Sequence, residues 1–127
     1  MSMKDKTYLV DSNIIIYHLN NSSIATEFLQ NSISISAISQ LTFLEVLSFD
    51  FSSEEQQKVI ELLEKFTILD TSKDISLQAI KNKKIKLADN IIASTAQVYD
   101  LTLVTRNTKD FNQINVKILN PFLKEED

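Results

Sequence analysis

The stretch YLVDSNIIIYHL, residues 8–19, sets Asp11, Ser12 and Asn13 between two apolar runs. The first run belongs to TYLV (7–10), which is typical of a buried strand, and four similar segments follow at ISIS (33–36), FTIL (66–69), LTLV (101–104) and VKIL (116–119). Helical patterns separate them over residues 13–19, 24–30, 40–49, 54–65, 74–81 and 87–99. Strands separated by helices favour parallel pairing with right-handed crossovers. The sequence therefore predicts a three-layer α/β domain with a central, mostly parallel five-stranded sheet and helices on both faces.

The helix signal is clearest in SSEEQQKVIELLEKF, residues 52–66. Ser52 or Ser53 is placed to cap this helix, and Glu55 or Gln56 to close a capping box. Because the chain has no glycine, we expect Asn, Ser and Asp to form its turns, since these residues tolerate unusual backbone angles next best.

The length of 127 residues is that of one ordinary domain. We expect a single domain over residues 1–127, with short frayed ends at about 1–6 and 123–127. No window approaches the ~18 apolar residues of a membrane span, and the first residues lack the apolar core of a signal peptide. These features, with the absence of cysteine, predict a cytoplasmic protein without a membrane segment.

Missing residue types exclude several chemistries. A chain without glycine cannot form a dinucleotide fingerprint or a phosphate-cradling loop. A chain with no cysteine and one histidine, His18, excludes thiolate zinc sites, His-rich metal sites and cysteine nucleophiles. We expect His18 to complement the dipole at the end of the first helix. Catalysis would then depend on carboxylates, hydroxyls, amides and lysines.

Four acids are predicted at one edge of the sheet. Ligands of open parallel sheets bind beyond the carboxyl ends of the strands. Asp11 directly follows the first strand, and Glu45 lies within roughly 9 Å of the edge at ~1.5 Å of helical rise per residue. Asp89 lies in the first turn of the helix before LTLV, and Asp110 follows that strand. Taken singly, Asp11 could form an Asx-turn and Asp89 could complement a helix dipole.

The surroundings of Glu45 favour a shared site. Its helix is apolar nearly all round, so we expect its carboxylate to be largely buried and to need a partner. No lysine or arginine occurs between Lys6 and Lys58. Four converging carboxylates repel one another, and a divalent cation relieves that repulsion. Oxygen ligands without His or Cys favour Mg²⁺ or Mn²⁺.

The net charge of −4 has the wrong sign for gripping nucleic acid over a broad surface. Without the four acids, thirteen acids remain against thirteen bases, so the acidity is concentrated at the proposed site. A local basic rim could still hold a phosphate backbone, and its candidates are Lys81, Lys83, Lys84, Lys86, Arg106 and Lys109. For any single lysine, a solvated helix end is an equally good interpretation.

The segments LVDSNIIIYHL, FLEVLSF, LADNIIASTA and LTLVTRNTKDF, in this order and spacing, resemble PIN-domain ribonucleases, especially the VapC-type toxins of toxin-antitoxin pairs. The resemblance implies that Asp11, Glu45, Asp89 and Asp110 form an acidic quartet that binds Mg²⁺ or Mn²⁺, supported by Asn13, Thr105 and Asn107. It implies metal-assisted hydrolysis of RNA that leaves a 5′-phosphate and a 3′-hydroxyl. It also implies a homodimer and an antitoxin partner whose peptide tail blocks the acidic groove.

Three alternatives stay open at this point. The first is a PIN-like module that binds RNA or a protein without cutting. The second is a receiver-type signalling domain with Asp70 as phosphoacceptor and Thr105 as switch hydroxyl, although it lacks the acidic pair after the first strand and the lysine after the fifth. A phosphatase of the haloacid dehalogenase type would need an Asp at position 13, where Asn13 stands.

Overall fold

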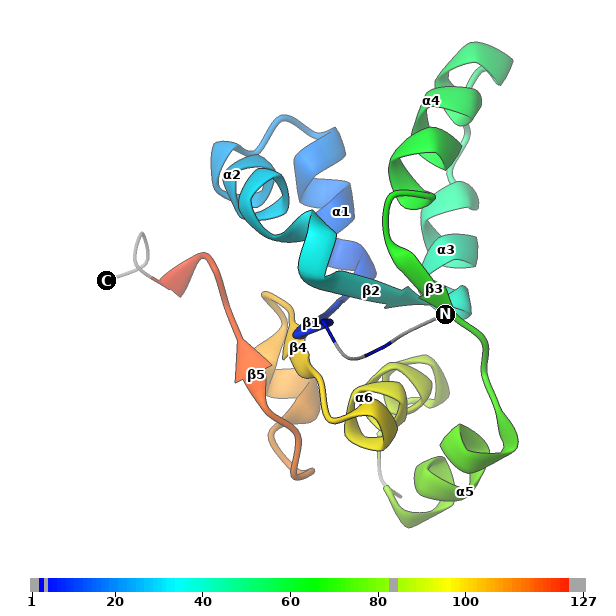
Figure 1. Ribbon diagram of the computed structural model, residues 1–127, viewed down its shortest axis with the longest axis vertical. Helices are drawn as coiled ribbons and strands as arrows, with labels where there is room; N and C mark the ends of the chain where they lie inside the picture. The colour runs from blue at the N-terminus through cyan, green and yellow to red at the C-terminus, as the bar shows by residue number, and fades with distance from the viewer. Residues whose placement is uncertain (1–2, 4, 83–84, 124–127) are drawn as a thin grey trace.

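The computed structural model describes residues 3, 5–82 and 85–123. Within these residues the chain forms one five-stranded sheet with the order β3-β2-β1-β4-β5, and every neighbouring pair is parallel (Figure 1). The strands are β1 (Tyr8–Val10), β2 (Ser36–Ser39), β3 (Thr67–Leu69), β4 (Thr102–Val104) and β5 (Ile118–Leu119). The predicted parallel α/β architecture is confirmed. The frayed ends predicted at 1–6 and 123–127 lie partly outside the described residues.

Six α-helices of the described residues connect the strands: α1 (Ser12–Leu19), α2 (Ser23–Ser32), α3 (Gln40–Leu47), α4 (Ser53–Leu63), α5 (Lys73–Lys81) and α6 (Leu87–Tyr99). Short 3₁₀ turns, η1 (Ile33–Ile35) and η2 (Thr108–Phe111), follow α2 and β4. The predicted helices agree with these bounds to within two residues. The capping box of α4 is confirmed, because Ser52 accepts from the Glu55 N–H at 3.1 Å and Glu55 accepts from the Ser52 N–H at 2.9 Å.

The prediction of a strand at residues 33–36 is wrong by three residues, because Ile33–Ile35 form η1 and the strand is Ser36–Ser39. The alternation of Ile and Ser suggested a strand with one buried face. A central parallel strand is buried on both faces and need not alternate, and all four β2 residues are buried. Ser36 donates to the Ser32 carbonyl at 2.7 Å, and Ser39 caps α3 by accepting from the Thr42 N–H at 3.0 Å.

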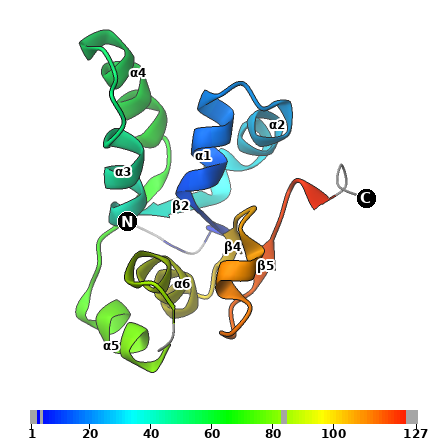
Figure 2. The same ribbon diagram turned by 180° about the vertical axis from the view of Figure 1, so that it is seen from behind.

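The sheet separates two apolar cores. Successive strand residues point to opposite faces, so Leu9 and Val10 of β1 belong to different clusters. The Val10 side is packed by residues of α1, α2, α3 and α4, and the Leu9 side by residues of α6, on which α5 packs. Both views show α1–α4 above the strands and α5 and α6 below them (Figures 1 and 2). The predicted three layers are confirmed.

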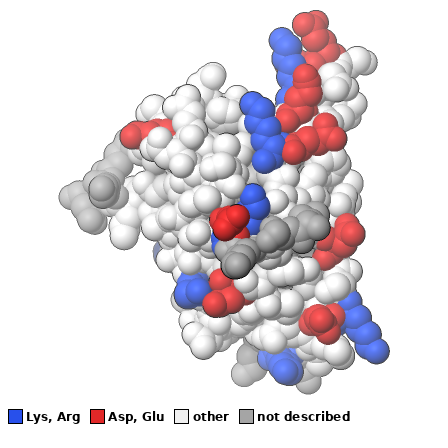
Figure 3. Space-filling model, in the orientation of Figure 1, with Lys and Arg blue, Asp and Glu red and all other residues white. Residues whose placement is uncertain are grey.

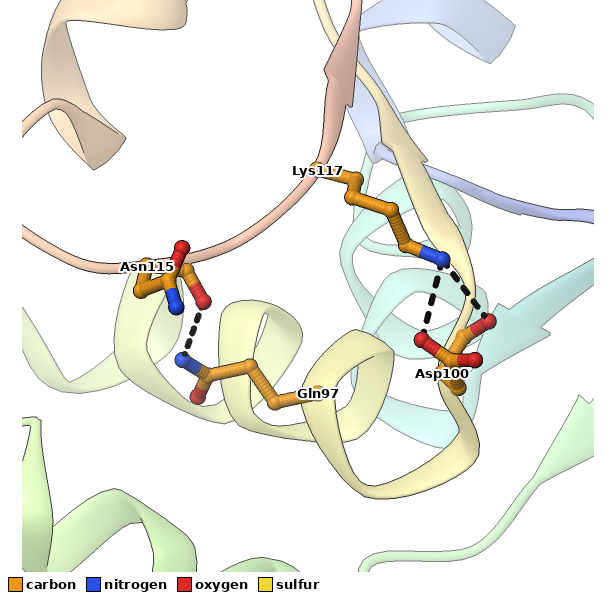
Figure 4. A network of polar contacts seen from close by, with 4 residues as sticks. All are labelled: Gln97, Asp100, Asn115 and Lys117. Atoms are coloured by element: carbon orange, nitrogen blue, oxygen red, sulfur yellow. Dashed lines mark hydrogen bonds and ion pairs between the residues drawn. The ribbon is translucent and has the colours of Figure 1, made fainter.

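Among the described residues, two turns adopt the left-handed backbone conformation that glycine usually occupies. They use Asn21 (φ 68°) and Asp100 (φ 55°), as expected for a chain without glycine. Asp100 ends α6, and its carboxylate pairs with Lys117 at 2.9 Å just before β5 (Figure 4). The Gln97 side-chain amide donates to the Asn115 carbonyl at 2.9 Å. These contacts hold the start of the edge strand β5 against the end of α6.

Charged side chains are interspersed over the face seen in Figure 3, most clearly along α4 at the upper right. This face shows no broad basic surface, which agrees with the net charge of −4. Among the described residues, no helix is both long enough and apolar enough to cross a membrane.

Candidate active site

The central strands β1 and β4 carry two polar residues to the same edge of the sheet. Val10 pairs with Val104 in parallel register, and the Asp11 N–H donates to the Val104 carbonyl at 2.9 Å. The next residue of each strand is therefore delivered to the carboxyl edge. Asp11 follows β1 and Thr105 follows β4, and their side chains meet there.

The Asp11 carboxylate is held by three short hydrogen bonds. Its Oδ1 accepts from the Ser12 N–H at 2.8 Å, and its Oδ2 accepts from Asn13 Nδ2 and Thr105 Oγ1, both at 2.9 Å. The residue is 5% exposed and is the N-cap of α1. The carboxylate thus caps α1 through the N–H of the next residue, whereas the Asx-turn considered from the sequence would use the N–H two residues on. The same carboxylate begins the helix and lies at the candidate site.

Thr105 and Asn13 orient each other. Thr105 Oγ1 accepts from Asn13 Nδ2 at 2.9 Å and from the Asn107 N–H at 3.1 Å. A hydroxyl has one hydrogen, so these two donors leave that hydrogen for Asp11. The side-chain amide oxygen of Asn13, Oδ1, accepts from the Arg106 backbone N–H at 3.2 Å. Asn107 acts through its backbone, and its side chain is exposed.

The Ser12 hydroxyl bridges the side chains of Glu45 and Asp11. The Ser12 hydroxyl is 3.0 Å from Glu45 Oε1 and 3.5 Å from Asp11 Oδ1. Glu45 is partly buried, so the predicted burial is confirmed in part and is less complete than that of Asp11. Its apolar neighbours are divided: Val46 lies in the core and Phe43 and Leu47 pack against it. Leu44 is 63% exposed and Phe49, beyond the end of α3, is 53% exposed. Sequence reasoning missed the bridge by Ser12, because no local pattern indicates a contact across 33 residues.

Electrostatic interactions link all four acids. Burial raises the pKa of Asp11 to about 6; hydrogen bonds from Thr105 and Ser12 oppose this, and the charges of Glu45 and Asp89 add to it. Burial also raises the pKa of Asp89, the Asp110 charge raises it further, and Lys86 lowers it. The interacting carboxylates thus form a continuous series at one edge of the molecule.

The donor set fits a hard divalent cation in chemistry and charge, because its acids offer oxygen ligands that repel one another. As the side chains stand, no three or more Asp, Glu, His or Cys residues in the described ranges are close enough to hold one ion together. A chelate would therefore need the carboxylates of α3, α6 and η2 to turn toward Asp11.

Asp89 and Asp110 line a surface pocket of about 180 Å³, together with Ile85, Lys86, Lys109, Asn112 and Gln113. Two of the predicted rim cations, Lys86 and Lys109, thus stand beside two of the acids. Lys83 and Lys84 lie outside the described residues, and Lys81 ends α5 with an exposed side chain.

Arg106 has contacts that the sequence did not indicate. Its guanidinium carbon lies 4.3 Å from the ring centroid of Phe122 and 5.1 Å from that of Tyr17. Both rings come from segments distant in sequence, one in α1 and one beyond β5. Only the tertiary structure brings them together.

Open parallel sheets whose central strands deliver polar side chains to a shared carboxyl edge define a class of α/β proteins that bind their ligands at that edge. The chain belongs to the PIN domain family, whose model matches residues 8–117. This confirms the resemblance seen in the sequence. Family membership also removes the receiver-type and haloacid dehalogenase-type alternatives.

Solved structures with this fold include chains of toxin-antitoxin complexes. A toxin-antitoxin complex from Klebsiella pneumoniae matches with 34% identity and a TM-score of 0.81, over 91% of this chain and 98% of that chain. VapBC-1 from nontypeable Haemophilus influenzae matches with 26% identity and a TM-score of 0.74, over 91% and 98%. VapBC2 from Rickettsia felis, bound to a promoter DNA fragment, matches with 26% identity and a TM-score of 0.72, over 90% and 98%. The comparison with curated proteins found no match.

Proposed function

We propose that this protein is a Mg²⁺- or Mn²⁺-dependent endoribonuclease and the toxin of a toxin-antitoxin pair. One observation carries the proposal: the Asp11 carboxylate, 5% exposed, is fixed by three donors at the carboxyl edge of the central strands and interacts electrostatically with Glu45 and Asp89. Holding a charge there is costly unless a cation compensates it. Membership of the PIN domain family supports the same conclusion.

Hydrogen bonding indicates which oxygen of Asp11 would bind the metal. Oδ2 accepts two hydrogen bonds at 2.9 Å, whereas Oδ1 accepts one short bond, from the Ser12 N–H. The Ser12 hydroxyl lies 3.5 Å from Oδ1, but its one hydrogen is better placed for Glu45 at 3.0 Å. Each carboxylate oxygen offers about two acceptor sites, so Oδ1 retains room for a cation. Ser12 also holds Glu45 beside Oδ1. Asp11, Glu45, Asp89 and Asp110 would hold the metal, with Asn13, Thr105 and Asn107 orienting Asp11.

When bound, the cation would activate water and stabilise negative charge on the phosphate oxygens. The chain itself would bring the RNA backbone to this point. Lys86 and Lys109 beside the pocket of Asp89 and Asp110 supply local positive charge for phosphate, and Lys83, Lys84 and Arg106 complete the rim predicted from the sequence. We expect hydrolysis to leave a 5′-phosphate and a 3′-hydroxyl.

The proposed partner is an antitoxin protein that blocks the acidic groove. The similar chains from Klebsiella pneumoniae, Haemophilus influenzae and Rickettsia felis were all solved in toxin-antitoxin assemblies, which supports this proposal. The homodimer and the cytoplasmic location expected from the sequence stay predictions.

Cleavage of labelled structured RNAs by the purified chain tests the function. We expect cleavage with Mg²⁺ or Mn²⁺, none with a chelator, and a loss of at least about 100-fold in Asp11→Asn, as expected when a metal ligand is altered. Asp70→Asn is the matched control. It removes the same charge at the same edge of the sheet, from the exposed residue that follows β3, and should leave the rate unchanged.

Metal-independent cleavage, or equal rates for wild type and Asp11→Asn, would contradict the proposed function, and cleavage that survives both the chelator and the substitution would point to a contaminant. RNA binding without cleavage in any divalent metal would instead favour the non-cutting PIN-like module. If Asp11→Asn and Asp70→Asn both lose cleavage, the activity depends on the general negative charge of this edge and not on Asp11 in particular.

A further inference from the structure

We propose that Arg106 is a positioning residue that sets the orientation of Asp11 through Asn13. Its guanidinium is held on the rings of Tyr17 and Phe122. This contact fixes the position of the Arg106 backbone N–H, which donates to Asn13 Oδ1. The segment beyond β5 thereby takes part in shaping the site at the end of β1.

The aromatic contact is built from three separate segments. Tyr17 lies in α1, Arg106 follows β4, and Phe122 follows β5. The rings of Tyr17 and Phe122 are 5.0 Å apart between centroids, with 55° between their planes. The Arg106 guanidinium carbon lies 4.3 Å from one centroid and 5.1 Å from the other, within the ~6 Å range of a cation–π contact. A planar guanidinium stacks on ring faces in a way that lysine does not reproduce.

Phe122 is itself held firmly. It is 5% exposed and belongs to the apolar core of the Val10 side. Its backbone N–H donates to Asn120 Oδ1 at 2.9 Å, which closes a turn directly after β5. The ring that receives Arg106 therefore has little freedom to move, so it is a fixed support for the guanidinium.

The backbone of Arg106 connects this support to the site. Its N–H donates to Asn13 Oδ1 at 3.2 Å. Because the side-chain amide of asparagine is planar, fixing Oδ1 also fixes the direction of Nδ2. Asn13 Nδ2 donates to Asp11 Oδ2 and Thr105 Oγ1, both at 2.9 Å. Movement of the Arg106 backbone would thus rotate the amide that holds Asp11.

The consequence for metal binding rests on the proposed function. Partners that orient a metal ligand typically change metal affinity 10–100-fold when they are altered. Arg106 lies one step further from the carboxylate than Asn13. We therefore expect a change of about 10-fold, at the low end of that range.

The test compares Phe122→Leu and Arg106→Met with Phe122→Tyr, which keeps the ring, and with Phe28→Leu. Phe28 packs on the same core and pairs edge-to-face with Tyr8, with centroids 5.3 Å apart, so its replacement removes a ring of equal size from that core. The first measurement is the NMR resonances of the Asn13 side-chain amide in the metal-free protein. The second is Mn²⁺ affinity by electron paramagnetic resonance.

We expect Phe122→Leu and Arg106→Met to shift the Asn13 amide resonances and to weaken Mn²⁺ binding about 10-fold, and Phe122→Tyr and Phe28→Leu to do neither. Unshifted Asn13 resonances in folded Phe122→Leu and Arg106→Met overturn the proposal, as does a shift in Asn13 with unchanged Mn²⁺ affinity. If the wild-type protein binds no Mn²⁺, the proposed function fails, and the Asn13 resonances alone still decide whether Arg106 positions the amide.

Discussion

Thr105 and Asp11 are 94 residues apart in the sequence, yet their side chains are joined by a hydrogen bond of 2.9 Å. The bond exists because β1 and β4 are parallel neighbours that end in register at Val10 and Val104. Thr105 donates its hydrogen to Asp11 and accepts from Asn13 and Asn107. One buried hydroxyl therefore holds the Asp11 carboxylate, the first turn of α1 and the loop after β4.

Replacing Thr105 by Val should destabilise the protein by about 2 kcal/mol. The change removes a fully buried hydroxyl that donates to the Asp11 carboxylate and accepts from Asn13 and Asn107. It should also raise the pKa of Asp11, since the hydrogen bond from Thr105 lowers that pKa in the wild type. Urea unfolding measures the first effect and carboxyl NMR the second.

Thr95→Val is the matched control, because Thr95 is equally buried and its hydroxyl bonds the Ile91 carbonyl within α6. It should cost less than Thr105→Val and leave the pKa of Asp11 unchanged. Equal costs for the two substitutions would contradict a special role for the Thr105 hydroxyl.

The raised pKa of Asp11 predicts a specific pH dependence of the metal-free protein. The carboxyl loses its proton near pH 3.8 when unfolded and near pH 6 when folded. Between these values the native state binds more protons, so its stability falls as pH rises. A shift of this size corresponds to about 3 kcal/mol.

Asp11→Asn lacks this titration. With chelator present, the stability of wild type relative to Asp11→Asn should fall between pH 4 and 7 and level off above it. Urea denaturation at a series of pH values measures the difference. Parallel pH profiles for the two proteins would contradict the raised pKa.

His18 should make the protein sensitive to acid. It lies in the last turn of α1, where the sequence suggested a charged partner for the helix dipole, but burial lowers its pKa from 6.5. Its Nδ1 is 2.7 Å from Thr26 Oγ1. As the pH falls, His18 is therefore protonated in the unfolded state before it is protonated in the folded state. The free energy of unfolding decreases as the pH falls through about 6.5.

His18→Gln should remove this loss, so wild type and variant should diverge in stability below about pH 6.5. As the one histidine of the chain, His18 also gives an unambiguous proton NMR titration. A titration midpoint of His18 at or above pH 6.5 in the folded protein would contradict the lowered pKa.

Helix positions could be predicted from sequence because apolar periodicity and caps are local. The capping box of Ser52 and Glu55 is an example, and it forms as predicted. The bounds of β2 could not be predicted, because Ile33 and Ile35 alternate with serines like a half-buried strand while the real strand is buried throughout. Burial on both faces is a property of the whole sheet.

The edge at which the acids lie could also be predicted, because strand ends and helix starts determine it. The hydrogen bonds could not, since Ser12 reaches Glu45 across 33 residues and Arg106 reaches rings in two other segments. Glu45 is less enclosed than its apolar helix suggested, because Val46 points into the core while Leu44 is 63% exposed. Local hydrophobicity does not tell a core helix from one with an exposed apolar face.

The position of β1 at the centre of the sheet has a consequence for synthesis on the ribosome. β1 precedes the other described strands in the chain, and it gains its neighbour β4 only when residues 102–104 have emerged. Until then Leu9 and Val10 have no strand paired on the β4 side, and Asp11 lacks the hydrogen bond from Thr105. A nascent or prematurely terminated chain that stops before β4 therefore cannot form the hydrogen bond from Thr105 to Asp11, so the proposed activity would require β4 to have been translated.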